Sequence, residues 1–364
     1  MARRAGGRTG GGGTAEISLL RIVAQRLAGP AFDTPAGVVR WLTAMQAQDF
    51  PGALTSVALR TAPRDRAAVV AALDAGEIVR SWPMRGTLHL VPAEDLVWLL
   101  RLLTPRALAK AATRRANLGL DEATIERART VAVDALAGGR RLRRDELMTV
   151  WQDGGVDTSG QRGYHLLGHL AQTGTVCLGP VKDGEQLIVR VDEWIPHPRL
   201  PEREEALGEL AERYFRGHGP ATLKDFLRWT GLTAADARAG IAVARPRLAT
   251  IDVDGEEHLL DPATPDLLAA HRAAAEELLL LPGFDELILG YADRTATVAA
   301  EHAERIVPGG NGVFRPTVIV GGRAVGTWRH HGTGDRRRID AEPFERFPAS
   351  VTDRIAKAYA ALPQ

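Results

Sequence analysis

Two Asp-Gly pairs lie between apolar runs in the middle of the chain. Asp183-Gly184 divides VCLGPVKDGEQLIVRV, and Asp254-Gly255 divides RLATIDVDGEEHLLD. Both central residues of a type I′ turn have positive φ, which Asp and Gly tolerate, so an Asp-Gly pair between apolar runs predicts a β-hairpin. Each hairpin follows a series of short helical patterns. The sequence therefore predicts small units in which several helices are followed by a two-stranded hairpin.

Three amphipathic segments precede each of these hairpins. They cover residues 122–137, 143–151 and 159–172 before the first hairpin, and residues 201–216, 221–230 and 233–239 before the second. Residues 17–100 have a similar order, with helices predicted over 19–27, 34–45 and 66–75 before the extended stretch PMRGTLHLV. Three helices and a two-stranded wing make a winged-helix unit, and the order of elements predicts three of them.

The pattern changes from Leu278 onward. Apolar stretches with glycine turns predict a small antiparallel sheet, and residues 342–362 predict a final helix. We therefore predict an α+β fold of three tandem winged-helix-turn-helix units with a C-terminal antiparallel β-rich domain. The predicted boundaries are a disordered basic, glycine-rich tail over 1–15, winged helices over 16–118, 119–200 and 201–277, and the β-rich domain over 278–364.

Positive charge is concentrated in one region. The whole chain has 46 Lys and Arg against 45 Asp and Glu, so its net charge does not indicate a polyanionic partner. Residues 101–144, however, hold 11 Lys and Arg against four acidic residues. This segment is a candidate phosphate-binding surface. A solvated helix face explains the charge equally well.

Several classes of protein are disfavoured by what the sequence lacks. Cys177 is the single cysteine, which excludes an intramolecular disulfide and a multi-cysteine zinc site. The sequence has no apolar run of about 18 residues and no apolar signal-peptide core. We therefore expect no membrane association and a cytoplasmic protein that is nucleoid-associated when it acts. No metal-ligand cluster and no phosphate-binding glycine loop are recognisable, so we expect no metal and no cofactor.

The stretch MQAQDFPG places Gln46 and Gln48 one residue apart where a helical pattern ends. Residues two apart diverge on a helix but share a face in extended backbone. Pro51 disfavours helical backbone at Phe50, so we expect the helix to unwind and the two amides to converge. A carboxamide forms hydrogen bonds but takes up no proton near neutral pH, so the pair could orient a water without acting as a strong base. Alternatively, one glutamine caps the helix and the other lies on the surface.

Two further stretches carry polar groups in suggestive positions. SWPMRGTLHLVP sets Arg85, Thr87 and His89 on one face of a predicted strand, where they could bind phosphate or organise a polar site. A histidine whose ring bonds to the backbone is the alternative. SGQRGYHLLGHL places Arg162, Tyr164 and His165 near the start of a third helix, where a winged-helix unit presents groups to a DNA groove.

Five motifs, in this order, resemble the AlkZ/YcaQ family of bacterial winged-helix DNA glycosylases. They are LTAMQAQDFPG, SWPMRGTLHLVPAED, YFRGHGPATLKDFLRWTGL, LLPGFDELILGYADR and NGVFRPTVIVGGRAVGTW, and the resemblance extends from Ile17 to about His330. In that family a glutamine, one residue, and then glutamine or aspartate form the catalytic motif. Gln46-Ala47-Gln48 matches the version with two glutamines. The resemblance implies that Gln46 and Gln48 are catalytic, and we add Asp49, Arg85, Thr87 and His89 as possible auxiliary residues.

The resemblance also implies a substrate and a reaction. It implies a DNA-binding cleft and excision of cationic N7-alkylated purines, including the unhooking of interstrand crosslinks made by genotoxic natural products. The subgroup with two glutamines is similar to self-resistance proteins of antibiotic producers. The expected partner is double-stranded DNA that carries alkylated or crosslinked purines, bound by a monomer. No lysine lies near the glutamines in sequence, so we expect a monofunctional hydrolase without a lyase step.

Nine residues are expected to belong to the DNA-binding surface. They are Arg114, Arg115, Arg143, Arg144, Arg162, Tyr164, His165, Arg323 and Arg329. A competing hypothesis from another class is a winged-helix transcriptional regulator or a non-catalytic DNA-binding protein, in which the glutamines are incidental. Sequestration of a DNA-damaging drug is a third hypothesis.

Overall fold

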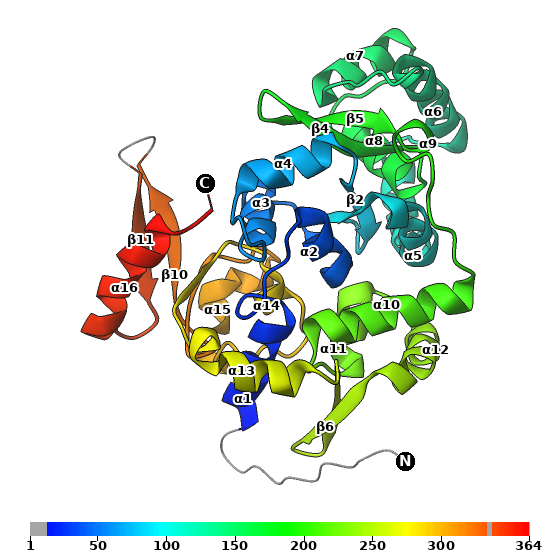
Figure 1. Cartoon of the computed structure of the whole chain (residues 1–364). Helices are drawn as coiled ribbons and strands as arrows, with labels where there is room; N and C mark the ends of the chain where they lie inside the picture. The colour runs from blue at the N-terminus through cyan, green and yellow to red at the C-terminus, as the bar shows by residue number, and fades with distance from the viewer. Residues whose placement is uncertain (1–12, 333–336, 364) are drawn as a thin grey trace. The chain divides into compact units, whose positions relative to one another are not determined.

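Both Asp-Gly pairs form the turns that the sequence predicts. The computed structural model describes residues 13–332 and 337–363 (Figure 1). φ is +53° at both Asp183 and Asp254, and +81° and +85° at the glycines that follow them. The first turn joins β4 (Val176–Lys182) to β5 (Glu185–Arg190), and the second joins β6 (Ala249–Val253) to β7 (Glu256–Leu260).

A third hairpin lies earlier in the chain, where the sequence predicted only an extended stretch. It joins β2 (Ile78–Met84) to β3 (Thr87–Pro92). Its turn residues, Arg85 and Gly86, have φ of +56° and +72°. Arg85 therefore lies at the tip of a turn, and the prediction that it belongs to the strand with Thr87 and His89 is wrong. Arg-Gly satisfies the backbone requirement of such a turn because glycine takes its second position.

Helices precede each of the three hairpins, as predicted, but the first set differs from the prediction: the predicted helix over 19–27 lies in α1 (Gly13–Ala24), and the helix over 50–58 was not predicted. The helices are α2 (Pro35–Leu42), α3 (Phe50–Ala58) and α4 (Arg66–Asp74) in the first set, α6 (Glu122–Leu136), α7 (Arg144–Asp153) and α8 (Arg162–Gln172) in the second, and α10 (Arg203–His218), α11 (Leu223–Thr230) and α12 (Ala234–Ala244) in the third. The remaining longer helices are α1 (Gly13–Ala24), α5 (Leu96–Asn117), α13 (Thr264–Ala275) and α16 (Ala349–Ala360).

The C-terminal part contains the predicted antiparallel sheet. Its strands are β8 (Leu279–Leu281), β9 (Thr317–Val320), β10 (Arg323–His331) and β11 (Arg338–Pro343), in the order β11-β10-β9-β8. The predicted final helix begins later than residue 342, because that position still pairs with β10 and Pro348 then precedes the first turn of α16. The predicted tail over 1–15 lies mostly outside the described residues, and α1 begins at Gly13. The observed mixture of helix and antiparallel sheet agrees with the α+β prediction.

Two compact units divide the chain. Unit 1 combines the described chain up to Ala31 with Phe215–Asp225 and Arg247–Leu362, and unit 2 consists mainly of Phe32–Tyr214 and Phe226–Pro246. In unit 1, α1 and α13 pack side by side (Figure 1). In unit 2, the β2–β3 and β4–β5 hairpins join with β1 (Met45–Gln46) into one five-stranded sheet of order β1-β3-β2-β4-β5. The third set of helices and strands is divided between the two units.

Two apolar clusters fill unit 2. One gathers Val38, Leu42, Met45, Val57 and Leu73 from the first set of helices and β1. The other gathers side chains from α6, α7 and α8, including the fully buried Trp151, against the β4–β5 hairpin. The sheet therefore has helices of both sets packed against it, which is how amphipathic helices bury their apolar faces.

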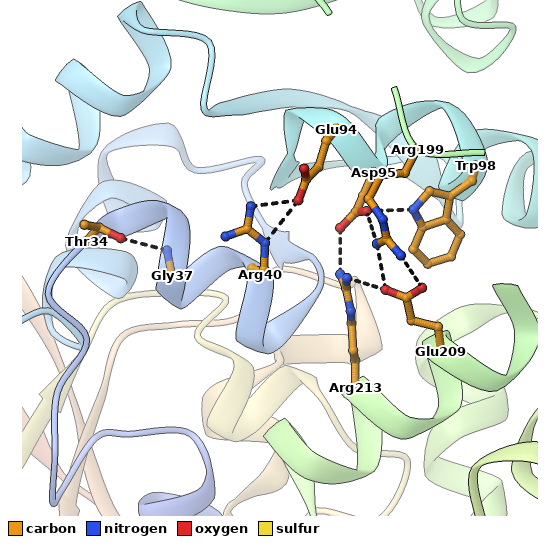
Figure 2. Close-up of polar contacts among 9 residues, drawn as sticks. All are labelled: Thr34, Gly37, Arg40, Glu94, Asp95, Trp98, Arg199, Glu209 and Arg213. Carbon is orange, nitrogen blue, oxygen red and sulfur yellow. Dashed lines mark hydrogen bonds and ion pairs between the residues drawn. The ribbon is translucent and has the colours of Figure 1, made fainter. Parts of the chain in front are cut away.

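A buried ion-pair network in unit 2 connects the start of α5 to α10 (Figure 2). The Asp95 side chain is fully buried, and its two oxygens accept hydrogen bonds from Arg199 (2.8 Å) and Arg213 (2.6 Å). The Trp98 indole donates to the same carboxylate at 2.8 Å, and Glu209 pairs with both arginines. Burial by itself would raise the pKa of Asp95, but Arg213, Trp98 and Arg199 hold it below the usual value of an aspartate.

A second buried polar network lies within unit 1 and explains two of the sequence motifs. Asp225 accepts hydrogen bonds from the backbone N–H groups of Ala292 (2.8 Å) and Asp293 (3.2 Å). The Arg21 guanidinium lies 3.7 Å from Asp225 and 3.6 Å from the centre of the Tyr291 ring. YFRGHGPATLKDFLRWTGL and LLPGFDELILGYADR thus supply groups that satisfy one another in the interior. Trp229 and Phe226 of the first of these motifs are also buried.

We predict that Asp95→Asn lowers the free energy of unfolding by about 3–5 kcal/mol at pH 7, because two arginines lose their buried counter-charge. The folded-state pKa of Asp95 is depressed, so its contribution is fully present above the unfolded value of about 3.9 and is lost as the pH falls through the folded value. Urea unfolding from pH 7 to pH 3 measures this. A difference between wild type and variant that stays constant below pH 4 would contradict the assignment.

Candidate active site

The glutamine motif lies in a short extended segment between two helices. Helix α2 ends at Leu42, and Thr43 has φ +68° and ψ −50°, an unfavourable region for a β-branched residue. Such a conformation costs on the order of 1–3 kcal/mol and persists only where the surrounding structure holds it. The chain then forms β1, which pairs with β3, before α3 begins at Phe50. The predicted unwinding is confirmed, although Phe50 is helical because Pro51 occupies the first turn of a new helix.

The backbone of Ala47 is fixed on both sides. Its N–H donates to the carbonyl of Leu88 at 2.8 Å, and its own carbonyl accepts from Nε of Arg80 at 2.8 Å. Its methyl group is fully buried in the apolar cluster of the first helices. Successive side chains of an extended chain point to opposite sides. Gln46 and Gln48 must therefore project together, away from this cluster.

The two carboxamides are hydrogen-bonded to each other. Nε2 of Gln46 donates to Oε1 of Gln48 at 3.0 Å, and the backbone N–H of Gln48 donates to Oε1 of Gln46 at 3.2 Å. Gln46 is 6% exposed, whereas Gln48 is exposed to solvent. The pair thus combines one anchored amide with one accessible amide, and the mutual bond fixes which end of each amide is the carbonyl.

Neither glutamine caps a neighbouring helix. The C-cap of α2 is Thr43, and the N-cap of α3 is Asp49, whose Oδ1 accepts from the N–H of Gly52 at 3.2 Å. The alternative in which a glutamine serves as a cap is therefore wrong. Asp49 is engaged as a cap, and its proposed auxiliary role has no geometric support beyond its position next to Gln48.

His89 lies beside the glutamine pair. It is the cross-strand partner of Gln46 in the β1–β3 ladder, so the two side chains share one face of the sheet. Its Nδ1 lies 2.9 Å from the carbonyl of Thr87, and its Nε2 lies 3.2 Å from Nη2 of Arg85. A carbonyl only accepts and a guanidinium only donates, so Nδ1 carries the proton and Nε2 accepts. Both ring nitrogens are engaged. The Thr87 hydroxyl turns to the carbonyl of Met84 at 3.4 Å.

Arg85 extends from this group to an open depression of about 280 Å³ in unit 2. The walls are one face of α5 and one face of α8, where small residues alternate with polar ones. The lining residues are Trp82, Arg85, Gly86, Ala107, Lys110, Ala111, Arg115, Tyr164, His165, Gly168, His169 and Gln172. None of these described residues carries a carboxylate. We call this depression the cationic pocket.

The positive charge of the cationic pocket comes from Arg85, Lys110 and Arg115. Burial, followed by the nearby Arg115 and Arg129, lowers the pKa of His169 to about 4. Burial and the neighbouring Arg114 and Arg115 also hold the pKa of His165 below its usual value. Both imidazoles are therefore mostly neutral at pH 7, and they line the pocket as hydrogen-bonding groups.

The structure brings together three of the nine residues expected to bind DNA, because Arg115, Tyr164 and His165 all line the cationic pocket. Arg144 lies near them, with its guanidinium 5.6 Å from the centre of the Tyr164 ring. Arg114 donates to Oε1 of Gln161 at 2.7 Å.

The other four expected DNA contacts have partners within the protein. Arg143 pairs with Asp183 at 2.7 Å and so braces the β4–β5 turn. Arg162 contacts Asp157 and the carbonyl of Leu118. In unit 1, Arg323 donates to the carbonyl of Thr295 at 2.7 Å, and the exposed Arg329 pairs with Asp340 at 2.7 Å.

Sequence reasoning missed Arg80 and His169, and it included Lys110 only as one of the basic residues of 101–144. Arg80 is separated from Ala47 by more than 30 residues, so no local pattern connects them. A signal did exist for the other two. Ala107, Lys110 and Ala111 follow helical spacing in α5, as His165, Gly168 and His169 do in α8, and small residues beside polar ones on two helix faces indicate a close, polar approach.

Neither a membrane span nor a metal-ligand cluster occurs within the described residues, 13–332 and 337–363. No helix there has the length and apolar character needed to cross a membrane. No group of three or more His, Cys, Asp or Glu residues there has the geometry to hold a metal ion. The polar site consists of amides, guanidinium groups, one ammonium and imidazoles.

Comparisons with known proteins agree on one family. A family model described as DNA glycosylase AlkZ-like matches residues 39–364. An interstrand DNA cross-link repair glycosylase from Streptomyces sahachiroi is 30% identical over 337 residues, which cover 88% of each protein. The solved structure of Streptomyces sahachiroi DNA glycosylase AlkZ matches with a TM-score of 0.77 and 25% identity, covering 96% of this chain and 97% of that one. This chain belongs to the AlkZ-like family of DNA glycosylases.

Proposed function

We propose that this family member is a monofunctional glycosylase that hydrolyses the N-glycosidic bond of cationic N7-alkylated purines in double-stranded DNA. The observation that carries the proposal is the pair of hydrogen-bonded carboxamides, Gln46 and Gln48, with one member accessible to solvent. Such a pair can position a water and stabilise positive charge, but it cannot take up a proton. The chemistry must therefore suit a site of uncharged amides.

Alkylation at N7 gives the purine a positive charge. When the bond between C1′ and N9 breaks, its electron pair moves onto the base, which departs as a neutral molecule and requires no general acid. A water oxygen then bonds to the oxocarbenium-like C1′, and the water proton is released to solvent. The second lone pair of a glutamine carbonyl oxygen accepts a hydrogen bond from this water. Positioning and preorganised dipoles lower such a barrier without a strong base.

The need for a neutral leaving base also makes the site selective for alkylated over undamaged purines. An undamaged purine would leave as an anion, so it needs a stronger activation than two amides provide. Gln46 is held by its hydrogen bond to Gln48 and by its place on β1, where it pairs with His89 of β3. This site offers no proton to the base, so ordinary nucleotides are not cleaved.

DNA binding is assigned to the cationic pocket and its surroundings. Arg85, Lys110 and Arg115 provide three positive charges for phosphate groups, and the half-exposed Tyr164 offers an aromatic face. We interpret the three sets of helices and hairpins as winged-helix units over 16–118, 119–200 and 201–277, followed by the β-rich domain over 278–364. The pocket then lies between α5 and the third helix of the second unit, the position that contacts a groove in winged-helix proteins.

Interstrand crosslinks are the proposed biological lesion. The Streptomyces sahachiroi relative is named as an interstrand DNA cross-link repair glycosylase. A crosslinked base is tied to the opposite strand and cannot enter a closed pocket completely. The exposure of Gln48 and the open form of the cationic pocket fit such a substrate. We also propose that the protein acts in DNA repair as a monomer.

We predict that Gln46→Met and Gln48→Met each reduce excision of N7-methylguanine by about 100-fold, because each removes one preorganised dipole. Single-turnover assays on a duplex, read as strand scission after alkali, measure the rate. Duplex affinity should stay near that of the wild type. Gln152→Met on α7 is the matched control, since this exposed glutamine lies outside the motif. Borohydride should trap no covalent complex with the wild type.

Base release, duplex retention and drug binding together separate the competing functions. Release of uracil or hypoxanthine at a rate equal to that of N7-methylguanine would contradict the need for a cationic base. Sequence-specific retention of undamaged duplex without base release would favour a regulator. Drug binding without DNA would favour sequestration.

We predict that Lys110→Gln and Arg115→Gln each weaken duplex binding and reduce the slope of log affinity against log salt by about one, because each removes one phosphate contact. Fluorescence anisotropy from 50 to 300 mM salt gives the slope. The matched control is Arg203→Gln, an exposed arginine of unit 2 that pairs with Asp236. If the salt slope of both variants equals that of the wild type, the cationic pocket is not part of the DNA-binding surface.

A further inference from the structure

Arg80 on β2 reaches behind the glutamine motif. It is half-buried, and its Nε donates to the carbonyl of Ala47, the residue between Gln46 and Gln48, at 2.8 Å. Its Nη1 donates to Oε1 of Gln186 on β5 at 2.8 Å. The guanidinium carbon lies 5.0 Å from the centre of the Phe50 ring, on the helix that follows the motif. One side chain thus contacts the motif, the next helix and the second hairpin.

The far end of this connection is itself fixed. Nε2 of Gln186 donates to the carbonyl of Gly179 at 3.3 Å, across the β4–β5 hairpin. Strands β2 and β4 pair at Arg80 and Leu178. Arg80 therefore leaves the sheet where the β2–β3 and β4–β5 hairpins join, and its guanidinium is held between the carbonyl of Ala47, directly after β1, and the side chain of Gln186 on β5.

The acceptors that Arg80 uses in the described chain are neutral oxygens. Burial lowers the pKa of Arg80 to about 10, and the nearby Asp49 opposes that shift. The side chain is still protonated at neutral pH, so its hydrogen bonds are charge-assisted and stronger than those of neutral donors. A partly desolvated cation aimed at one backbone carbonyl is a strong restraint on that carbonyl.

We propose that Arg80 is a positioning residue for the glutamine pair. By holding the Ala47 carbonyl, it keeps the motif extended and sets the directions in which Gln46 and Gln48 project. The inference rests on the proposed function for its kinetic consequence. Its geometric part, the orientation of the two carboxamides, stands independently of the substrate.

Arginine has properties here that lysine lacks. The guanidinium is planar, carries several donors in fixed directions, and stacks on aromatic rings. It can bond to Ala47 and Gln186 while its face approaches Phe50. A lysine ammonium carries its three donors on a single nitrogen and has no planar face, so it cannot reproduce the fork that spans these two acceptors. Arg80→Lys keeps the positive charge but removes the planar fork of donors, so it separates the effect of charge from the effect of donor geometry.

We expect Arg80→Lys and Arg80→Met to reduce the single-turnover rate of N7-methylguanine excision by about 10- to 100-fold, the effect of misplacing a positioned group. Duplex affinity should change by less than about twofold, well below one phosphate contact. Gln186→Leu, which frees one end of the guanidinium, should give a smaller loss in the same direction. The matched control is Arg190→Met on β5, where the arginine pairs with Asp192 and Glu193 at the surface.

A structural readout accompanies the kinetics. The side-chain amide resonances of Gln46 and Gln48, in ¹⁵N-labelled protein, should shift in the Arg80 and Gln186 variants and stay in place in Arg190→Met. If Arg80→Met does not fold, Arg80→Lys and Gln186→Leu decide the question. Wild-type excision rates in these variants, or rates that fall only in proportion to Tm or duplex affinity with unmoved amide resonances, overturn the inference. If the wild type itself releases no N7-methylguanine, the proposed function fails, and the amide resonances still test the role of Arg80.

Discussion

The geometry of the candidate site depends on how the backbone of Ala47 is held. One hydrogen bond to Leu88 fixes its N–H, another from Arg80 fixes its carbonyl, and its methyl group is packed in the core. An extended residue restrained in this way has one orientation, and its two neighbours must then point to the other side. The unfavourable φ of Thr43 and the N-cap of Asp49 bring the chain into and out of this segment. Short-range strain and long-range hydrogen bonds together keep two amides side by side where a continuous helix would separate them.

The electrostatics of unit 2 fit a cationic base and an anionic backbone at the same time. The glutamine pair is uncharged, and His89 beside it has both ring nitrogens engaged. Positive charge lies on Arg80, behind the motif, and on Arg85, Lys110 and Arg115 of the cationic pocket. The two histidines of the pocket have lowered pKa values and add little charge at pH 7. In the proposed reaction, the cations of the pocket attract phosphate, and the two amides offer dipoles to a base that already carries a positive charge.

Elements that depend on neighbouring residues could be predicted from the sequence. Elements that depend on contacts between distant residues could not. The Asp-Gly turns were predicted because two residues determine the backbone there. Helix α5 was missed because its first half is mostly apolar and its second half mixes alanine with polar residues, so it has no amphipathic stripe. The end of α2 was placed three residues too late, since nothing local shows that Met45 pairs with Leu90 on β3. Arg85 was placed on a strand because an arginine in the first position of a tight turn is uncommon.

The sequence by itself indicated that helices precede each two-stranded hairpin. It also showed Gln46 and Gln48 as the candidate catalytic pair and pointed to the family of the protein. Turn residues, helical periodicity and a break before Pro51 are properties of neighbouring residues, so they can be read without a fold. Only the tertiary structure decided that Gln46 and Gln48 bond to each other, that Arg80 reaches the motif and is held by Gln186, and that two helix faces line the cationic pocket. The two contacts of Arg80 join residues 33 and 106 positions apart, and the free energy that selects them comes from packing the whole sheet, which no short segment encodes.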